Sequence, residues 1–381
     1  GQSIFLEGHR QNTAMFAESR SGANFGGFGF LTPAKIYQFL LPLLLIAIGH
    51  GSIVREREAR TLAPVLSQGV PGTHIYLGKW LSLASVAALS LIPLAIASFW
   101  AVMNGETLDV SLGLIGTYAV YLLVWVSVIV LVSLVAKTRG VALGVLVLFW
   151  LIVTLIVPRI AVASAAAAYP AEGKIETDLR LEADKRKLGD GHNASDPAFE
   201  AFRANLLAQY DAETIEELPV NFRGMVASKS EAELTVLMNQ YAEEKMQLER
   251  QQSTFMNGFG WLSPVVATSA ASQSLASTGL STHHRFLRET EALRIDFVQG
   301  LNQAHAEELS YVDDINRGRD NESAMRARVS SENWNVLQDF EFTPAGSGER
   351  WTEASQPLVM LLVWLTGLMS GGLLLALRMK P

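Results

Sequence analysis

The sequence contains no cysteine among its 381 residues, which excludes disulfide bridges and thiolate metal sites. Several catalytic motifs are also missing. The chain has no GxxxxGK[ST] phosphate loop, no HExxH zinc motif and no GxSxG nucleophile turn. The protein therefore cannot bind ATP through a phosphate loop of its own, and we expect neither an enzyme nor a chain with a bound cofactor or metal.

Charge is distributed unevenly along the chain, whose formal net charge is −7. Residues 168–355 carry 18 Lys and Arg against 31 Asp and Glu, whereas the remainder carries 12 against 6. An acidic, polar block is thus joined to a mildly basic and very apolar remainder.

Five segments are long and apolar enough for membrane helices, because about 20 mostly apolar residues cross about 30 Å of hydrocarbon. The run GVALGVLVLFWLIVTLIV has no polar face, which argues against a core helix of a soluble protein. Pro42 and Pro93 fall inside such segments, where neighbouring helices can satisfy the carbonyl groups that they free. The expected fold is all-α and polytopic, with spans at 34–54, about 75–103, about 112–135, about 141–163 and 358–377.

The loops between these segments predict the orientation, because Lys and Arg collect on the cytoplasmic side of a membrane. If the spans alternate, residues 104–109 and the acidic block fall on one side. We therefore expect an inner (plasma) membrane protein whose acidic block is periplasmic. The Lys and Arg residues that fall on the other side are Arg55, Arg57, Arg60, Lys79, Lys137, Arg139, Arg378 and Lys380.

In this arrangement residue 1 lies outside, and neither an initiator Met nor a signal peptide precedes it. We therefore expect a sixth, N-terminal span that this sequence lacks. The expected domains are an extracytoplasmic approach segment at 1–33, spans at 34–167 with a cytoplasmic loop at 54–79, an acidic helical domain at 168–355, and the last span and tail at 356–381.

The acidic block reads as long helices. Ser195 with Pro197 predicts one helix start, Ser230 with Glu233 forms a capping box, and a third helix follows Gly279. The intervening stretch FMNGFGWLSPVVATSAASQSLAS is apolar and rich in small residues. Two interpretations remain open: the stretch lies on or in the outer leaflet, or it is a buried turn between two helices.

Few residues suggest ligand chemistry. His283, His284 and His305 could form a metal site, although solvated surface histidines are the simpler interpretation. DDINRGRDNE, from Asp313, has the composition of a calcium loop without the EF-hand spacing, and we interpret it as a solvated loop. His50 either marks a transport path or simply reaches the membrane interface.

The loop REREARTLAPVLSQGVPGTHIYLGK carries many charges for its length. Arg55 with Glu58 and Glu56 with Arg60 have the spacing of helical ion pairs. One interpretation is an amphipathic helix held against the cytoplasmic leaflet by two spans; the other is an ordinary loop with positive-inside charges. The expected apolar face consists of Leu62, Val65 and Leu66, and the helix breakers are Gly69, Pro71 and Gly72.

The pattern ERE…TL..VLS.GV…….LGKW in this loop resembles the first cytoplasmic loop of ABC transporter permeases of the ABC-2 (type V exporter) class. The stretches LEGHRQNTAMFA, VPRIA and LSPVVATSAASQSLASTGLSTHHRF are similar to a branch with a large helical extracytoplasmic insertion before the last span. The residues that carry the loop resemblance are Glu56, Arg57, Glu58, Thr61, Leu62, Leu66, Ser67, Gly78 and Lys79.

The resemblance implies that the loop is a coupling helix docked in a cleft of a separate ATPase subunit, which holds the ATP and Mg. It also implies two ATPase subunits and a second permease, identical or related, with export as the activity. The ATPase-coupling residues would be Arg55, Glu56, Arg57, Glu58, Thr61, Leu62, Val65, Leu66 and Lys79.

Small residues in the last span would allow close packing between two permeases. These are Gly367, Ser370, Gly371 and Gly372. An alternative function stays open, in which the complex acts mechanically on an extracytoplasmic protein partner and moves no substrate through the spans. A membrane-anchored receptor without an ATPase is a third interpretation, which leaves the loop unexplained. No sequence feature indicates nucleic-acid binding.

Overall fold

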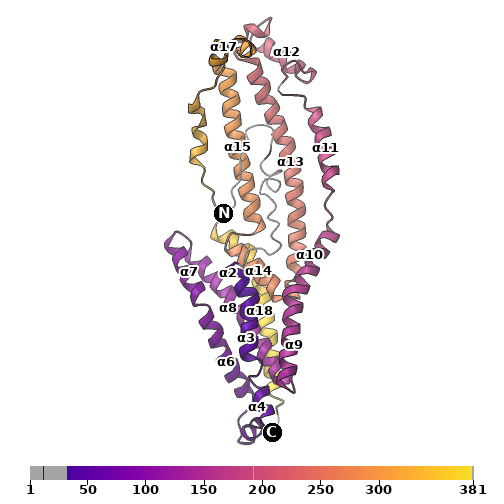
Figure 1. The fold of residues 1–381 in the computed structure, drawn as a ribbon, viewed down its shortest axis with the longest axis vertical. Helices are drawn as coiled ribbons and strands as arrows, with labels where there is room; N and C mark the ends of the chain where they lie inside the picture. Colours follow the sequence, from indigo (N-terminus) through magenta and orange to yellow (C-terminus); the bar gives the residue numbers. More distant parts are fainter. Residues whose placement is uncertain (1–11, 13–31, 192, 380–381) are drawn as a thin grey trace. The chain divides into compact units, whose positions relative to one another are not determined.

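The computed structural model describes residue 12 and residues 32–191 and 193–379, without the side chains of 336–339. Most of the expected approach segment at 1–33, with the motif LEGHRQNTAMFA, lies outside these residues. Helices dominate the described part of the chain, and no strand occurs in it (Figure 1). The prediction of an all-α protein is confirmed.

The chain divides into two compact units. The membrane unit contains residues 32–170, Arg250–Thr282 and 344–379, and the polar unit contains Ala171–Glu249, His283–Thr343 and Asn12. The stretch 250–282, which the sequence analysis counted with the acidic block, thus belongs with the apolar helices. Two long helices, α13 (Phe222–Gly258) and α15 (Leu280–Glu308), contribute residues to both units.

Four helical stretches of the membrane unit are long and apolar enough to cross a membrane, and a bent pair of helices makes a fifth if it is counted as one span. These stretches are Pro33–Glu58, Leu108–Val135, Arg139–Ala168 and Ser347–Ala376, with the pair Gly72–Ser90 and Ile92–Met103. The helices that lie wholly in this unit, those of the spans included, are α2 (Pro33–Lys35), η1 (Ile36–Leu40), α3 (Leu41–Gly49), α4 (Val54–Glu58), α5 (Leu62–Ser67), α6 (Gly72–Ser90), α7 (Ile92–Met103), α8 (Leu108–Val135), α9 (Arg139–Leu151), η2 (Ile152–Ile156), α10 (Val157–Ala168), η5 (Phe259–Trp261), α14 (Pro264–Leu275) and α18 (Ser347–Ala376).

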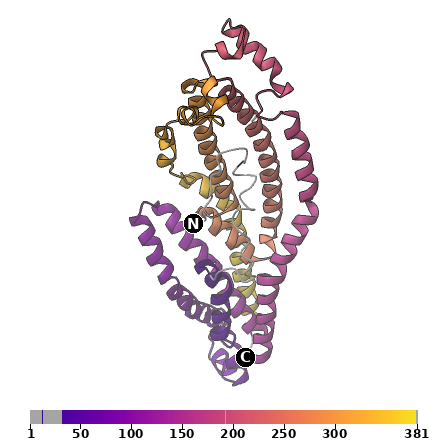
Figure 2. The ribbon, with the colours of Figure 1, turned by 45° about the horizontal axis from the view of Figure 1, so that its top comes forward.

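Proline explains the irregular points of these spans. Pro93 lies in the first turn of α7, and the axis of the α6–α7 pair bends there by 42° (Figure 2). Pro42 and Pro158 follow the two π-helical segments of the described residues, η1 and η2. Pro42 cannot donate to the carbonyl of Gln38, and the Tyr121 hydroxyl donates to it instead, at 2.6 Å. A neighbouring helix therefore satisfies the freed carbonyl, as expected.

The centre of the membrane unit is α8. Its residues Tyr121, Trp125 and Ile129 are fully buried, and the rings of Tyr121 and Trp125 meet edge to face. Apolar residues of other spans face outward instead, and Phe99 and Trp100 are 69% and 70% exposed. Such side chains would be costly in water and suit contact with lipid.

The small-residue helix α14 lies against α8 and α18 (Figure 1). Its residues Val265, Ala267 and Ala271 are buried, and Ser263 caps its first turn and donates to the carbonyl of Val153 at 2.6 Å. The interpretation of burial among helices therefore fits α14, whereas Trp261 and Leu262, earlier in the same stretch, are 48% and 61% exposed. Small side chains are used here because they let α14 approach its neighbours closely.

In the polar unit, α13 and α15 run side by side in opposite directions (Figures 1 and 2). Arg288 and Arg294 of α15 meet Glu243 and Glu231 of α13, and the N–H of Asn221 donates to the carbonyl of Ala306 at 2.7 Å. The remaining helices of this unit are α11 (Lys174–Lys187), η3 (Pro197–Phe199), α12 (Glu200–Gln209), η4 (Ile215–Glu217), α16 (Tyr311–Asn316), α17 (Asn321–Arg326) and η6 (Ser331–Asp339).

Gly224 is needed where α13 and α15 come closest, since a β-carbon there would lie 2.5 Å from the backbone nitrogen of Ala306. Two predicted helix starts were wrong. Ser230 lies inside α13, where it is buried, so the capping box with Glu233 does not begin a helix. Asp196, and not Ser195, caps the turn that starts at Pro197.

Candidate functional site

The loop after the first span is locked to the end of α8 by reciprocal capping. The hydroxyl oxygen of Ser133 accepts the N–H groups of Ile53 and Val54, at 3.0 and 3.1 Å. In return, the Arg57 guanidinium donates to the carbonyls of Leu134 and Ala136, at 2.7 and 2.6 Å. These are groups that a helix end leaves without an internal partner. The start of α4 and the end of α8 therefore form one joint.

Two ion pairs fasten the same loop to two further spans. Glu58 accepts from the side chain of Arg139 at 2.5 Å and from its backbone N–H at 2.9 Å, so it caps α9. Glu56 pairs with Lys79 of α6 at 2.5 Å. The predicted pairs within the loop, Arg55 with Glu58 and Glu56 with Arg60, were wrong because both carboxylates reach neighbouring helices.

The expected apolar face of the loop is divided. Leu62 is 6% exposed and packs into the core of the membrane unit, with Leu66 half-buried against it. Val65 is 36% exposed, and Val70 is 37% exposed. The surface open to a partner therefore contains Val65 and Val70 but not Leu62. Thr61 is exposed, and its hydroxyl donates to the carbonyl of Glu56 at 3.2 Å.

A cavity of about 540 Å³ opens beside this joint. Its lining includes His50, Arg55, Glu56, Lys79 and Arg139. The Nδ1 atom of His50 lies 3.1 Å from the carbonyl oxygens of Ile46 and Ala47. His50 and charged residues of three helices, α4, α6 and α9, therefore line one space.

The four small residues of α18 do not share one environment. A β-carbon on Gly372 would lie 2.2 Å from the hydroxyl oxygen of Tyr76, so this glycine serves packing within the chain. Nothing lies within 4 Å of a β-carbon built on Gly367 or Gly371, and Ser370 is exposed. Gly367, Ser370 and Gly371 thus remain candidates for contact with a second permease, and Gly372 does not.

The histidines proposed as metal ligands are divided between two places in the polar unit. His284 is buried, with its Nε2 atom 2.7 Å from a carboxylate oxygen of Glu249, whereas His283 is exposed. His305 lies 21 residues further along α15 and contacts Asp314. In the part of the chain that the structure describes, no group of three His, Asp or Glu residues could hold a metal ion.

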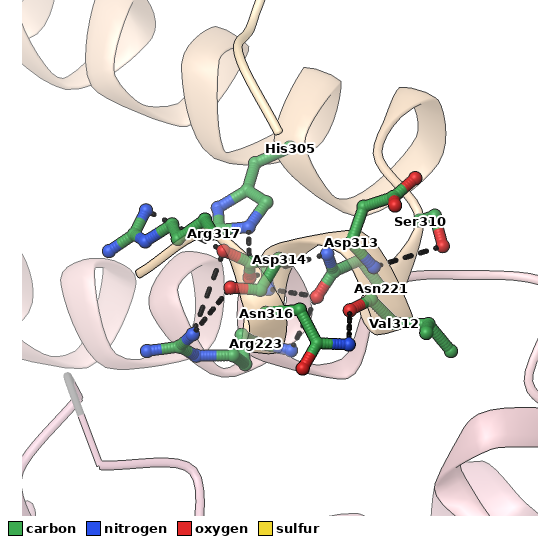
Figure 3. Close-up of polar contacts among 10 residues, drawn as sticks. Asn221, Arg223, His305, Ser310, Val312, Asp313, Asp314, Asn316 and Arg317 are labelled. Carbon is green, nitrogen blue, oxygen red and sulfur yellow. Dashed lines mark hydrogen bonds and ion pairs between the residues drawn. The ribbon is translucent and has the colours of Figure 1, made fainter. Parts of the chain in front are cut away.

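The calcium-like loop is mostly exposed, as expected, but its residue Asp314 belongs to a buried ionic cluster (Figure 3). Asp314 is 1% exposed, and its Oδ2 atom lies 2.9 Å from Nε2 of His305. Guanidinium nitrogens of Arg223 and Arg317 lie 3.6 and 3.5 Å from its Oδ1 atom. Burial raises the pKa of Asp314, but the hydrogen bond with His305 and the guanidinium groups of Arg223 and Arg317 outweigh it and hold the pKa below its ordinary value.

A second buried cluster joins α13 to α15. Arg294 is 2% exposed and donates to Glu231 and Glu291, each at 2.8 Å. The desolvation of Arg294 lowers its pKa, but the hydrogen bonds to the two carboxylates prevail and raise it. Neither cluster could be predicted from the sequence, because alternating charges on a helix usually indicate a solvated face.

Together these arrangements define a helical membrane protein. The loop after its first span is bonded to three neighbouring helices, and its polar unit contains buried ion pairs. Residues 174–343 match a protein-family model described as a domain of unknown function (DUF3526), and this stretch covers most of the polar unit and α14. No curated protein and no solved structure matches the chain.

Proposed function

We propose that this chain is the transmembrane permease subunit of an ATP-driven exporter of the ABC-2 class. ATP and Mg are bound by two copies of a separate ATPase subunit. The single observation that carries the proposal is the attachment of residues 53–58, at the start of the loop, to three spans. The loop is joined to α6 through Lys79, to α8 through Arg57 and Ser133, and to α9 through Glu58.

This fastening suits a coupling element, because a push on α4 and α5 is delivered to several spans at once. An ordinary connecting loop would need no such set of caps and ion pairs. Its exposed apolar residues, Val65 and Val70, supply the surface for a groove of the ATPase. Burying one such side chain contributes roughly 1.5–3 kcal/mol to association.

The test is capture of the ATPase by the purified permease, combined with ATP turnover in reconstituted vesicles. Val65→Asp or Val70→Asp should weaken ATPase association by roughly tenfold or more. Gln68→Asp, an exposed polar position between them, is the matched control and should bind normally. Full association and normal turnover in the Val65→Asp/Val70→Asp double variant would rule out docking through this loop.

The remaining parts of the proposal follow from the class. The permease works as a dimer with itself or a related chain, in the inner membrane, with the polar unit on the periplasmic side. The positively charged loops support this orientation, since Arg55, Arg60 and Lys137 are all exposed at loop positions.

A second candidate function is force transmission to an extracytoplasmic protein partner. It is favoured by the length of α13, whose 37 residues correspond to about 55 Å of helix, and by the buried Arg294 cluster that ties α13 to α15. Reconstituted complexes that turn over ATP and reposition a partner bound to the polar unit, with no ATP-dependent flux of amphiphile or peptide probes, would favour this candidate.

A further inference from the structure

A second cavity, of about 480 Å³, lies within the membrane unit. Its walls come from η1, η2, α10, the end of α13, α14, the start of α15 and α18. Both π-helical segments contact α14, so the cavity lies where these two segments meet one small-residue helix. Its volume falls in the range of small-molecule pockets, roughly 300–1,000 Å³.

The backbone explains why polar groups occur in this wall. Gln38 and Thr154 each precede a proline, Pro42 and Pro158, by four residues, and all but Pro42 line the cavity. A proline cannot donate to the carbonyl four residues before it, so each helix widens into a π turn there. Gln38 is 6% and Thr154 2% exposed, so both are shielded from lipid. Such π turns are frequent at functional sites.

The lining is divided between apolar and polar side chains. Phe39, Val162, Met256, Val265, Val266 and Leu280 offer apolar surface. Neutral polar groups include Ser253, Thr254, Asn257, Ser269 and Gln273. Arg250 and Glu353 are the charged residues of the described lining, one of each sign, and Ser281 donates to Glu353 at 3.0 Å.

This composition excludes two simpler ligands. A bare metal ion would require converging carboxylates or histidines, and no such group occurs among the described residues. A wholly apolar molecule would displace water from the charged groups of Arg250 and Glu353 without replacing its hydrogen bonds, which costs free energy. A molecule with an alkyl chain and a polar head suits both surfaces.

We propose that this cavity is a binding site for a zwitterionic, lipid-like amphiphile. Arg250 faces the anionic group of the head and Glu353 its ammonium group, and the alkyl chain runs along the apolar residues. The inference goes beyond coupling to an ATPase, because binding needs only this chain. Loss of ATPase docking would leave it intact, and its failure would leave the docking experiment unaffected.

The test uses the full chain, purified in detergent and stripped of lipid, with binding followed by native mass spectrometry. The probes are lysophosphatidylethanolamine, lysophosphatidylglycerol and monoacylglycerol, whose heads are zwitterionic, anionic and uncharged. We expect one molecule of the first to bind at least roughly tenfold more tightly than the other two, because only it engages both charges. Equal or tighter binding of the anionic or uncharged probe would overturn the proposal.

Substitutions separate this site from lipid bound around the spans. Ala270→Trp fills the cavity from α14 and should abolish the one-molecule binding, whereas Ala276→Trp, at an exposed position just after α14, should preserve it. Ser253→Phe repeats the test from α13 if Ala270→Trp does not fold. Unchanged binding in a folded cavity-filling variant would mean that the lipid is only annular.

The head-group assignment has its own control. Glu353→Gln should remove the preference for the zwitterionic over the anionic probe, since the partner of the ammonium group loses its charge. Glu349→Gln, one turn earlier on α18 and outside the lining, should retain the preference. A retained preference in Glu353→Gln would overturn the assignment.

Discussion

Glu58 and Arg139 are separated by 81 positions in the chain, yet they are joined by two hydrogen bonds. The Arg139 side chain donates from Nε to one carboxylate oxygen of Glu58 at 2.5 Å, and the backbone N–H of Arg139 donates to the other at 2.9 Å. The carboxylate thereby pairs with a cation and caps α9 at the same time. It links the loop after the first span to the start of another span, which gives the loop a fixed position.

Reversal of this pair provides the first prediction. Glu58→Arg should place two cations together and release the loop, and Glu58→Arg/Arg139→Glu should restore the attraction. We expect faster amide exchange over residues 54–67 in the single variant and partial recovery in the double variant, which regains the ion pair but not the bond to the backbone N–H of residue 139. An exposed pair contributes only about 0–1 kcal/mol to stability, so global unfolding should change little. Equal exchange in all three proteins would show that the pair does not fix the loop.

The second prediction concerns the Arg294 cluster. Arg294→Ala leaves Glu231 and Glu291 buried without their cation, and removing one partner of such a cluster costs about 3–5 kcal/mol. Arg288→Ala is the matched control on the same helix, because Arg288 is exposed and its pair with Glu243 should contribute about 0–1 kcal/mol. Chemical denaturation followed by helix content measures both. A similar small loss in the two variants would mean that the buried cluster adds nothing to stability.

The third prediction is a pH dependence that originates at Asp314. Its folded-state pKa lies below the ordinary 3.8, so its contribution to stability is complete above about pH 4 and is lost as the pH falls through the folded-state pKa. Asp314→Asn should therefore reduce the loss of stability as the pH falls below about 4, at a cost of about 1–3 kcal/mol near neutrality. Thermal unfolding at a series of pH values measures it.

Asp296 on α15 is exposed and provides the control for this measurement. Asp296→Asn should keep both the stability near neutrality and the slope in acid. An unchanged acid slope in Asp314→Asn would contradict the role assigned to the cluster.

The absence of cysteine makes the fourth prediction, on membrane orientation, straightforward to test. Ser331 and Ser195 are exposed in the polar unit, and Thr138 is exposed between α8 and α9. In whole cells, Ser195→Cys and Ser331→Cys should react with a membrane-impermeant thiol reagent, and Thr138→Cys should react only after the membrane is opened. Labelling of position 138 alone in intact cells would invert the proposed orientation.

The fold could be predicted largely because apolar runs of span length depend only on local composition. The carbonyl group that Pro42 frees was also predictable, because proline has no N–H to donate. Its partner, the Tyr121 hydroxyl, was not predictable, because Tyr121 lies on another helix. The position of α14 could not be predicted, because a short apolar segment packs equally well on a membrane or between helices. The partners of Glu56 and Glu58 were missed for a similar reason: spacing within a helix reveals neighbours on that helix, whereas Lys79 and Arg139 become neighbours only through tertiary packing.

The last prediction separates two adjacent glycines of α18. Gly372 abuts Tyr76, a fully buried residue of α6, and a β-carbon would lie 2.4 Å from the ring atom Cζ. Because the ring cannot move aside within a packed core, Gly372→Ala should destabilise the membrane unit by about 1–3 kcal/mol. Gly371→Ala has open space and should gain slightly, since alanine favours a helix over glycine by about 1 kcal/mol. Thermal unfolding in detergent compares them directly.

If Gly371→Ala instead reduced the dimer fraction while Gly372→Ala left it unchanged, the open side of α18 would be the contact with a second permease. Equal stability of the two variants would contradict the packing of α18 against α6.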